Sequence, residues 1–398
     1  MTGASSSNRL TTSSPKDHNE LLGAMRTLTV FRIATLLVLI TLQGHAQALE
    51  FVFVGPRSMG MGGAGVAVTT DALATYWNPA GLAMTQTVDI RILAGGQAID
   101  RGGFANAVRD LENFNTSDTS PANIAQAQNI ANSLNQPGAN TSLNGAAGFY
   151  LKGHFGEHAF GFNISDVATG GGFITNPVQV SGTTISGTLL LNGLEQRQVA
   201  FSYAYAFADK TFSIGLTAKA VQGAAYNGSE TLQGGQNVKV SSNFGKPEIS
   251  TAFSIDAGAI YRPSSWLRLG VVAKDINQPE FDAPDGSTIK LGPQVRGGVA
   301  VNPYSSLTLT SDVDITSNKT LVPGVKSQVL SLGAEQTILT EFLSFRLGTF
   351  KNMQDAKTPF TPTAGLGLRF YAFRLDLGGG YDFREKGALA SGSVSLTF

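Results

Sequence analysis

Hydrophobic and polar residues alternate at every second position in many short stretches of this 398-residue chain. Residues 199–207 carry valine, phenylalanine or tyrosine at each odd position and alanine or serine between them, and residues 212–220 repeat the pattern. A period of two indicates β-strands with one apolar face. No stretch after residue 48 holds 18 consecutive apolar residues, so the pattern predicts no transmembrane helix there.

The same alternation predicts fourteen strands, most of about 9 to 11 residues, the length that crosses a bilayer at a tilt. Short connections such as Gly156-Glu157 alternate with long ones such as 168–196 and 222–248, as in an up-and-down outer-membrane barrel. We therefore expect an all-β membrane protein, a 14-stranded antiparallel transmembrane β-barrel over residues 87–398. Its strands are expected over 88–99, 145–155, 158–167, 197–207, 211–221, 249–261, 266–275, 293–302, 307–315, 328–337, 342–350, 363–371, 373–382 and 389–398.

The second face of these strands is rich in alanine, glycine, serine and threonine and poor in charge. A secreted soluble β-protein, the alternative interpretation, has no reason to keep charge off its exposed face. In a barrel this face lines the lumen, together with a few charged residues: Arg268, Lys274, Asp312, Asp314 and Arg346.

The N-terminal region has the features of a secretory signal peptide. Arg26 and Arg32 precede a mostly apolar run over 33–42, and a small-x-small pattern ends at Ala48. The first 24 residues are polar, so Met25 is a plausible true start. We expect residues 1–48 to be a signal peptide with a misassigned upstream start, cleaved after Ala48.

Two segments break the rhythm of the strands. Residues 49–86 are rich in glycine and have too little length for a separate domain, so we expect a plug, or hatch, inside the lumen. An insertion over about 101–143 shows helical periodicity at 104–113 and 121–135. It is expected to form a helical first extracellular loop.

Composition excludes several classes of function. Only 14% of residues are charged, and 28 basic side chains balance 28 acidic ones, so no basic surface for nucleic acid is expected. The absence of cysteine excludes thiolate chemistry and cysteine zinc sites.

Several motifs lack the context that their chemistry needs. Gly60, Gly62 and Gly65 satisfy G-x-G-x-x-G, but no βαβ unit follows, so tight turns are expected instead of a nucleotide site. His154 and His158 flank a predicted turn and are expected to be solvated. We predict no enzyme, no cofactor and no metal site. Glu335, Asp312 and Asp314 are expected to pair with luminal cations, Arg268, Lys274 or Arg346, and to support the hatch.

The hatch carries a family resemblance. It reads GPRSMGMGGAGVAV over 55–68 and ATYWNPAGLA over 74–83. This resembles the N-terminal hatch of the FadL-type outer-membrane superfamily, in which a glycine-rich segment leads to an Asn-Pro-Ala motif, here Asn78-Pro79-Ala80. The opening, the helical loop, and residues 274–281 and 324–335 are closest to the PorV branch and to the proteins catalogued as TraF-like conjugal transfer proteins.

The resemblance implies a 14-stranded barrel with a hatch in the outer membrane of a Gram-negative cell. It implies passive uptake of small hydrophobic compounds, fatty acids or aromatic hydrocarbons. The alternative is an accessory component of secretion or conjugal transfer with a sealed barrel that acts through its loops. Expected partners are outer-membrane lipid, a hydrophobic ligand or a secretion or conjugation partner, and the barrel-insertion machinery, which would recognise the last strand ending at Phe398.

Two sets of residues are candidate sites. The residues expected to hold or gate the hatch are Arg57, Met59, Met61, Tyr76, Trp77, Asn78, Pro79 and Ala80. Simple packing, or a capped turn at Asn78, is the alternative role for this set. Polar residues before a glycine run at 170–172 could interrupt strand pairing and open the wall sideways: Gly161, Asn163 and Asp166.

Overall fold

The computed structural model describes most of the chain after the predicted signal peptide: residues 49–232, 245–355, 359–384 and 386–398. The predicted signal peptide, 1–48, lies outside the described residues. In the described part, no helix combines the length and apolar character needed to cross a membrane.

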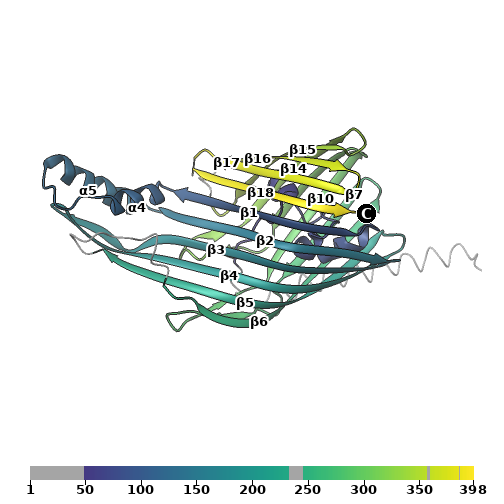
Figure 1. The fold of residues 1–398 in the computed structure, drawn as a ribbon, viewed down its shortest axis with the longest axis horizontal. Coiled ribbons are helices and arrows are strands. Elements are labelled where there is room, and N and C mark those ends of the chain that lie inside the picture. The colour runs from purple at the N-terminus through teal and green to yellow at the C-terminus, as the bar shows by residue number, and fades with distance from the viewer. Residues whose placement is uncertain (1–48, 233–244, 356–358, 385) are drawn as a thin grey trace, which may run out of the picture. The chain divides into compact units, whose positions relative to one another are not determined.

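Fourteen antiparallel strands form a closed barrel in which each strand pairs with its neighbours in the chain and the first pairs with the last (Figure 1). Backbone hydrogen bonds between Val88 and Phe398, of 2.9 and 3.1 Å, complete the closure. The predicted barrel and its strand number are confirmed. The strands are β1 (Asp89–Arg101), β2 (Asn140–Phe155), β3 (His158–Ser181), β4 (Thr184–Phe207), β5 (Phe212–Leu232), β6 (Glu248–Ser264), β7 (Leu267–Lys274), β10 (Gln294–Tyr304), β11 (Leu307–Asp314), β14 (Val329–Ile338), β15 (Leu343–Asn352), β16 (Thr361–Phe370), β17 (Phe373–Asp382) and β18 (Gly387–Thr397).

Strands β3, β4 and β5 are much longer than expected, with 24, 24 and 21 residues. The prediction of a long loop over 168–196 is wrong, because β3 and β4 remain paired up to a turn at Gly182-Thr183. Pairing continues because apolar side chains in this extension, Val178, Ile185 and Leu189, are buried under helices.

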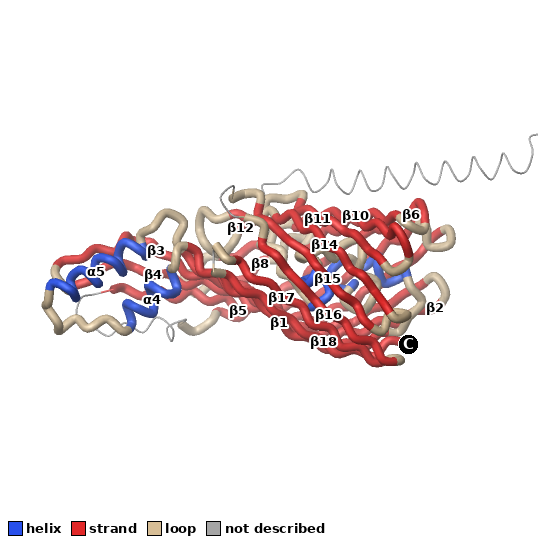
Figure 2. The backbone as a smooth tube through the Cα atoms, turned by 90° about the horizontal axis from the view of Figure 1, so that it is seen from above, coloured by secondary structure: helices blue, strands red, loops and turns tan. Residues whose placement is uncertain are grey.

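Those helices are α4 (Phe104–Glu112) and α5 (Pro121–Leu134), which connect β1 to β2 and lie beside the far ends of β3 and β4 (Figures 1 and 2). The Ser120 hydroxyl caps α5 by accepting a hydrogen bond from the Asn123 amide. The Asn135 side chain bonds both backbone groups of Val178, at 2.7 and 2.8 Å, and so covers the free edge of β3.

The barrel has two different ends. Turns such as Gly156-Glu157, together with the C-terminus, form the short-turn end, and the longer connections form the long-loop end. Two small hairpins occur in the long connections, β8 (Glu280–Asp282) with β9 (Thr288–Lys290) and β12 (Asn318–Lys319) with β13 (Lys326–Ser327).

The segment before β1 is buried against the inward faces of the strands and belongs to one compact unit with the barrel. It contains α2 (Pro56–Gly60), α3 (Ala74–Trp77) and the 3-10 helix η1 (Pro79–Met84), drawn in purple in Figure 1. We call residues 49–88 the N-terminal segment.

Candidate functional site

Inward-facing glycines on nine strands let the N-terminal segment lie directly on the barrel wall. A Cβ atom at Gly270 would lie 2.9 Å from the Val66 carbonyl oxygen, and one at Gly298 would lie 3.2 Å from the Ala67 nitrogen. A side chain at these positions would therefore push the segment away. This glycine seat consists of Gly161, Gly215, Gly258, Gly270, Gly298, Gly333, Gly348, Gly365 and Gly378, and it contacts the segment between residues 56 and 80.

A network of buried charges holds the segment near the short-turn end. Arg57 of the segment lies 2.6 Å from Glu335, which also lies 2.6 Å from Arg346. Arg346 in turn pairs with Asp376 at 2.8 Å, and Asp376 lies 3.5 Å from Arg91. Removing one member would leave its partners charged and desolvated, a large penalty. We call these five residues the ionic layer.

Asp71 extends the ionic layer from the segment side, because its carboxylate lies 3.0 Å from Arg91. Burial alone would raise the pKa of Asp71, but the positive charges of Arg91, Arg57 and Arg374 lower it below the usual range. Asp71 is therefore held in its charged form. The arrangement is that of a structural anchor, since every charge faces an opposite one.

The luminal charges predicted from the sequence support the segment in different ways. Glu335 pairs with Arg346, as expected. Asp312 instead accepts hydrogen bonds from the backbone amides of Gly65 and Val66, at 2.7 and 2.8 Å. Asp314 pairs with Arg296. Arg296 occupies an inward position of β10, but it was not among the luminal cations predicted from the sequence.

Asn78 joins three parts of the structure. Its side chain accepts a hydrogen bond from the Ala80 amide and so caps η1, and its Nδ2 donates to Val66 of the segment and Ala259 of β6. Pro79 and Ala80 follow as the first buried residues of η1. This geometry contains the predicted capped turn and adds a direct bond to the wall.

Aromatic side chains form the middle of the segment. Phe51 is stacked on Trp77 with 5.3 Å between ring centroids, and Trp77 donates to the Val54 carbonyl. The Lys274 ammonium lies 3.3 Å from the centroid of Tyr76, and the Arg296 guanidinium lies 4.1 Å from that of Phe51. Cations over aromatic faces are stabilised by the ring quadrupole.

Met59 and Met61, two of the residues predicted to hold or gate the hatch, are also buried in packing. Met59 belongs to the cluster around Phe51 and Trp77, and Met61 packs with Ala67 and Ala300. Gly62 has φ +69°, as expected for a tight turn. Within the described residues, no cluster of three His, Cys, Asp or Glu side chains is placed to hold a metal.

The predicted sideways opening at β3 is wrong for this structure. Residues 158–172 pair without interruption with β2 on one side and β4 on the other. Gly161 and Asn163 face inward, where the Asn163 amide donates to the Thr75 hydroxyl of the segment. Asp166 forms an exposed ion pair with Arg197 at 3.4 Å. Side chains in a strand point alternately to the two faces of the sheet and do not take part in backbone pairing. Polar residues here therefore contact the segment or a neighbouring strand without interrupting the wall.

Near the long-loop end, side-chain packing replaces the glycine seat and the ionic layer. Leu49 begins the described segment and lies among residues of β4, β5 and the β8–β9 hairpin. We call this group the mouth cluster: Leu49, Leu194, Val221, Ala225, Phe281, Ala283 and Leu291.

Glu50 adjoins the mouth cluster and was missed by the sequence analysis. Burial raises the pKa of Glu50, although its hydrogen bond to Asn144 and the charge of Arg101 act in the opposite direction. The Thr169 hydroxyl also lies 3.4 Å from its carboxylate. A single carboxyl group before an apolar run gives no sequence signal of such burial.

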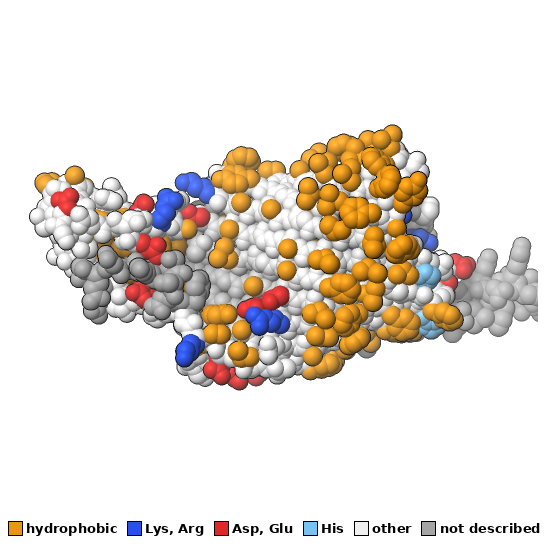
Figure 3. Space-filling model, viewed as in Figure 1, with side chains coloured by type: hydrophobic (Ala, Val, Ile, Leu, Met, Phe, Trp, Pro, Cys, Tyr) orange, Lys and Arg blue, Asp and Glu red, His pale blue; other side chains and the backbone are white. Residues whose placement is uncertain are grey.

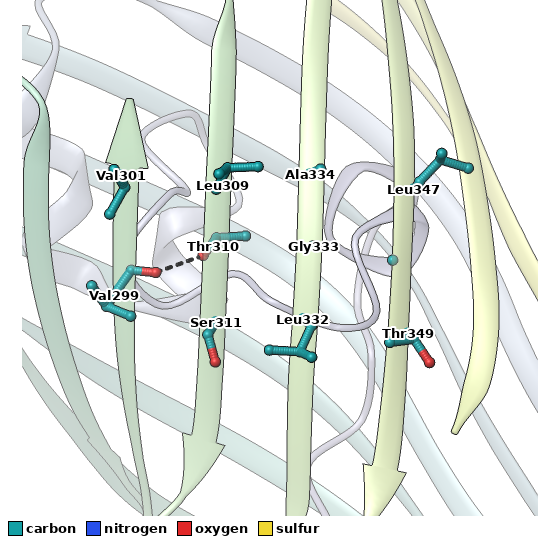
Figure 4. A pocket seen from close by; sticks show the side chains of 11 residues that line it. Val299, Val301, Leu309, Thr310, Ser311, Leu332, Gly333, Ala334, Leu347 and Thr349 are labelled. Carbon is teal, nitrogen blue, oxygen red and sulfur yellow. Dashed lines mark hydrogen bonds between the residues drawn. The ribbon is translucent and has the colours of Figure 1, made fainter. Parts of the chain in front are cut away.

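Two cavities differ in position. A space of about 40 Å³ lies inside the barrel between Gln97, Phe350 and Leu389. A shallow groove of about 550 Å³ lies on the outward face of β10, β11, β14 and β15, where exposed Leu309, Leu332 and Leu347 surround it (Figure 4). The inner space is too small for a hydrocarbon ligand.

Comparisons with known proteins agree with this geometry. A family model described as "F plasmid transfer operon, TraF, protein" matches residues 75–314. The structure is similar to that of the Ralstonia pickettii toluene transporter TbuX, with 15% sequence identity, a TM-score of 0.51, and coverage of 86% of this chain and 97% of that one. It is also similar to a Pseudomonas aeruginosa FadL homologue, with 12% identity, a TM-score of 0.53, and coverage of 88% and 99%. No curated protein matches the chain in sequence.

Proposed function

Since this chain belongs to the family described as F plasmid transfer operon, TraF, protein, and shares the fold of hydrocarbon transporters, we propose that it is an outer-membrane barrel for passive uptake of small hydrophobic compounds. Fatty acids and aromatic hydrocarbons are the substrate classes. The observation that carries the proposal is a closed 14-stranded barrel whose lumen holds a segment seated on glycines and charges.

The outward face supports a position in a membrane. Hydrophobic side chains gather on the wall toward the short-turn end, and charged side chains appear nearer to α4 and α5 (Figure 3). Aromatic residues form a girdle at the short-turn end, as outer-membrane barrels place them at the lipid interface. The exposed members are Phe155, Phe160, Tyr203, Phe207, Tyr261, Trp266, Tyr304, Phe342, Phe370, Tyr371, Phe373 and Phe398.

In this proposal the N-terminal segment, residues 49–86 of the sequence analysis, is the hatch, and α4 and α5 belong to the first extracellular loop. Residues 56–80 are held by the glycine seat, so they remain in place. A passage therefore opens by movement of the part that the seat does not hold, residues 49–54.

The proposal is tested with the exported protein reconstituted in lipid vesicles. Radiolabelled toluene and palmitate are added, and uptake is compared with that of protein-free vesicles. We expect saturable uptake of at least one of the two compounds. Absence of uptake for both compounds would overturn the proposal.

A second candidate function is that of an accessory component in conjugal transfer or secretion. It is favoured by the helices α4 and α5, which build a separate apolar core on the extended β3 and β4. Replacing residues 104–134 with a short flexible linker tests it. Loss of DNA transfer or secretion, with uptake unchanged, supports the accessory function, and unchanged transfer and secretion contradict it.

A further inference from the structure

The groove on the outward wall has small residues at its centre and leucines at its sides (Figure 4). Ala334 lies between Leu309 and Leu347 in the cross-strand register, so its methyl group leaves a depression between two exposed leucines. Ser311 does the same beside Leu332, one row nearer to the long-loop end. A groove that crosses four strands, each about 4.8 Å from the next, is wider than one hydrocarbon chain. It therefore has room for more than one acyl chain.

Lys351 provides the outward charge of this part of the wall. The structure describes every residue of β10, β11, β14 and β15, and the other charged side chains of these strands are buried on the inward face: Arg296, Asp312, Asp314, Glu335 and Arg346. Lys351 follows Leu347 and Thr349 of the groove at a period of two, so it lies on the outward face at the long-loop end of the groove. Its ammonium lies 5.9 Å from the ring centroid of Phe360.

The β12–β13 hairpin adds two lysines at the same end of the groove. Lys319 and Lys326 are direct cross-strand partners, an arrangement in which like charges repel each other. The alternate residues of the hairpin are buried, so the two lysines share its more exposed face. The Asn352 side chain donates to the Lys326 carbonyl at 2.8 Å and thereby joins the hairpin to the end of β15, next to Lys351. Among the described residues, no carboxylate pairs with any of these three lysines, so a bound anion would relieve their repulsion.

We propose that the groove and the three lysines form a binding site for a phosphorylated lipid with several acyl chains, the chemistry of the lipid A part of lipopolysaccharide. The acyl chains lie in the groove, and the ammonium groups of Lys319, Lys326 and Lys351 donate to the phosphate. Lysine binds phosphate as a point charge. Long loops of outer-membrane barrels are extracellular, so the lysines face the outer leaflet. The inference depends on the position of the barrel in the membrane and not on the proposed uptake.

Shape and charge contribute to this site in different ways. In a bilayer every outward side chain contacts lipid tails, so an apolar surface alone selects no particular lipid. The depression at Ala334 lets acyl chains pack closely, and close packing adds dispersion contacts that a smooth wall lacks. The lysines then select lipids whose headgroup carries phosphate. Both parts can be altered separately.

The test measures equilibrium binding of radiolabelled diphosphorylated lipid A to the full-length exported protein in detergent. Lys326→Gln with Lys351→Gln removes two cations of the site, and we expect binding to weaken at least tenfold. The matched control, Arg109→Gln with Lys246→Gln, removes the same charge from exposed positions outside the site and should stay within twofold of the wild type. Circular dichroism confirms that each variant is folded.

The groove is tested by a second pair of variants. Ala334→Phe fills the depression, and we expect at least threefold weaker binding. Ala390→Phe places the same ring on an exposed position of β18, outside the groove, and should have no effect.

Two further probes identify what the site recognises. Lipid A without its phosphates should bind the wild type at least tenfold more weakly, and inorganic phosphate in large excess should not displace lipid A. Equal binding of the dephosphorylated lipid, displacement by phosphate alone, or equal losses in a test variant and its control would each overturn the inference. Toluene and palmitate uptake is measured in vesicles without lipid A, so failure of the lipid site and failure of the proposed function are told apart.

Discussion

The two halves of the lumen hold the same segment by different means. Toward the short-turn end, the segment lies on bare glycine backbone and is anchored by the ionic layer, in which Arg346 is wholly buried. Toward the long-loop end, Leu49 and Phe51 are held by side-chain packing and by contacts with aromatic rings. Packed side chains can separate without any change in the strands, whereas a backbone fitted to a closed wall moves only if the wall moves. Under the proposed uptake function, this difference puts the opening at the long-loop end.

The largest expected effect comes from the ionic layer. Arg346→Ala leaves Glu335 and Asp376 buried without their shared cation, and we expect a loss of about 3–5 kcal/mol in the free energy of unfolding. Urea unfolding in detergent, followed by circular dichroism, measures it. Arg369→Ala, which removes an exposed pair with Glu341, is the control and should cost about 0–1 kcal/mol. Equal losses for the two variants would contradict a structural role of the ionic layer.

The glycine seat comes next. Gly348→Ala places a methyl group against the backbone of Met61 and Gly62, and overpacking of this kind costs about 1–3 kcal/mol. Gly153→Ala is the matched strand control, because no atom lies within 4 Å of its added Cβ, and it should change stability by no more than about 0.5 kcal/mol. The same unfolding assay applies. If Gly348→Ala is as stable as the control, the segment is not seated as described.

Asn78 tests whether the hatch contact is structural or gating. Asn78→Ala removes the cap of η1 and the bonds to Val66 and Ala259, and we expect a loss of about 0.5–2 kcal/mol. Because residues 56–80 stay seated in the proposed passage, toluene uptake in vesicles should remain within about twofold of the wild type. A tenfold change in uptake with unchanged stability would instead assign a gating role to Asn78.

The smallest effect belongs to the mouth. The raised pKa of Glu50 means that the folded protein favours the neutral carboxyl group. The stabilisation from this protonated group is complete below pH 4.5, the ordinary pKa of glutamate in the unfolded chain, and is lost as the pH rises through the pKa of Glu50 in the folded protein. Glu50→Gln should therefore melt above the wild type at pH 7, and the gap should close below about pH 4.5. Glu280→Gln, at an exposed glutamate, is the control. A constant gap at all pH values would contradict burial of a titrating Glu50.

Much of the barrel could be predicted because alternation is a local property. Each strand can be predicted from its own residues. The predicted bounds of β16 and β17 lie within two residues of the observed ones. The extensions of β3 and β4 were missed because their outward apolar residues are covered by α4 and α5, which come from earlier in the chain. The helices themselves were predictable from periodicity and from the cap at Ser120.

The candidate site was less accessible to sequence reasoning. The hatch residues from Arg57 to Ala80 were recognised by resemblance, but their partners were not, because Arg57 meets Glu335 and Gly62 meets Gly348 across more than 270 positions. The expected interruption at β3 rested on glycine and polar composition, and backbone pairing does not depend on side-chain polarity. Phe281 was part of a recognised motif, and its place against Gly223 required the fold of the hairpin onto β5.

The sequence by itself determined the strand number, the direction in which each side chain points and the presence of a glycine-rich segment before the barrel, since a two-residue period is set by the local backbone. Only the tertiary structure decided that nine glycines of distant strands form one seat, that the wall is continuous at β3, and that Phe281 fills the mouth. The physical reason is closure. A closed barrel brings residues that are far apart in the chain to the same height of the lumen. Steric fit and charge pairing at that height depend on side chains from all the surrounding strands together.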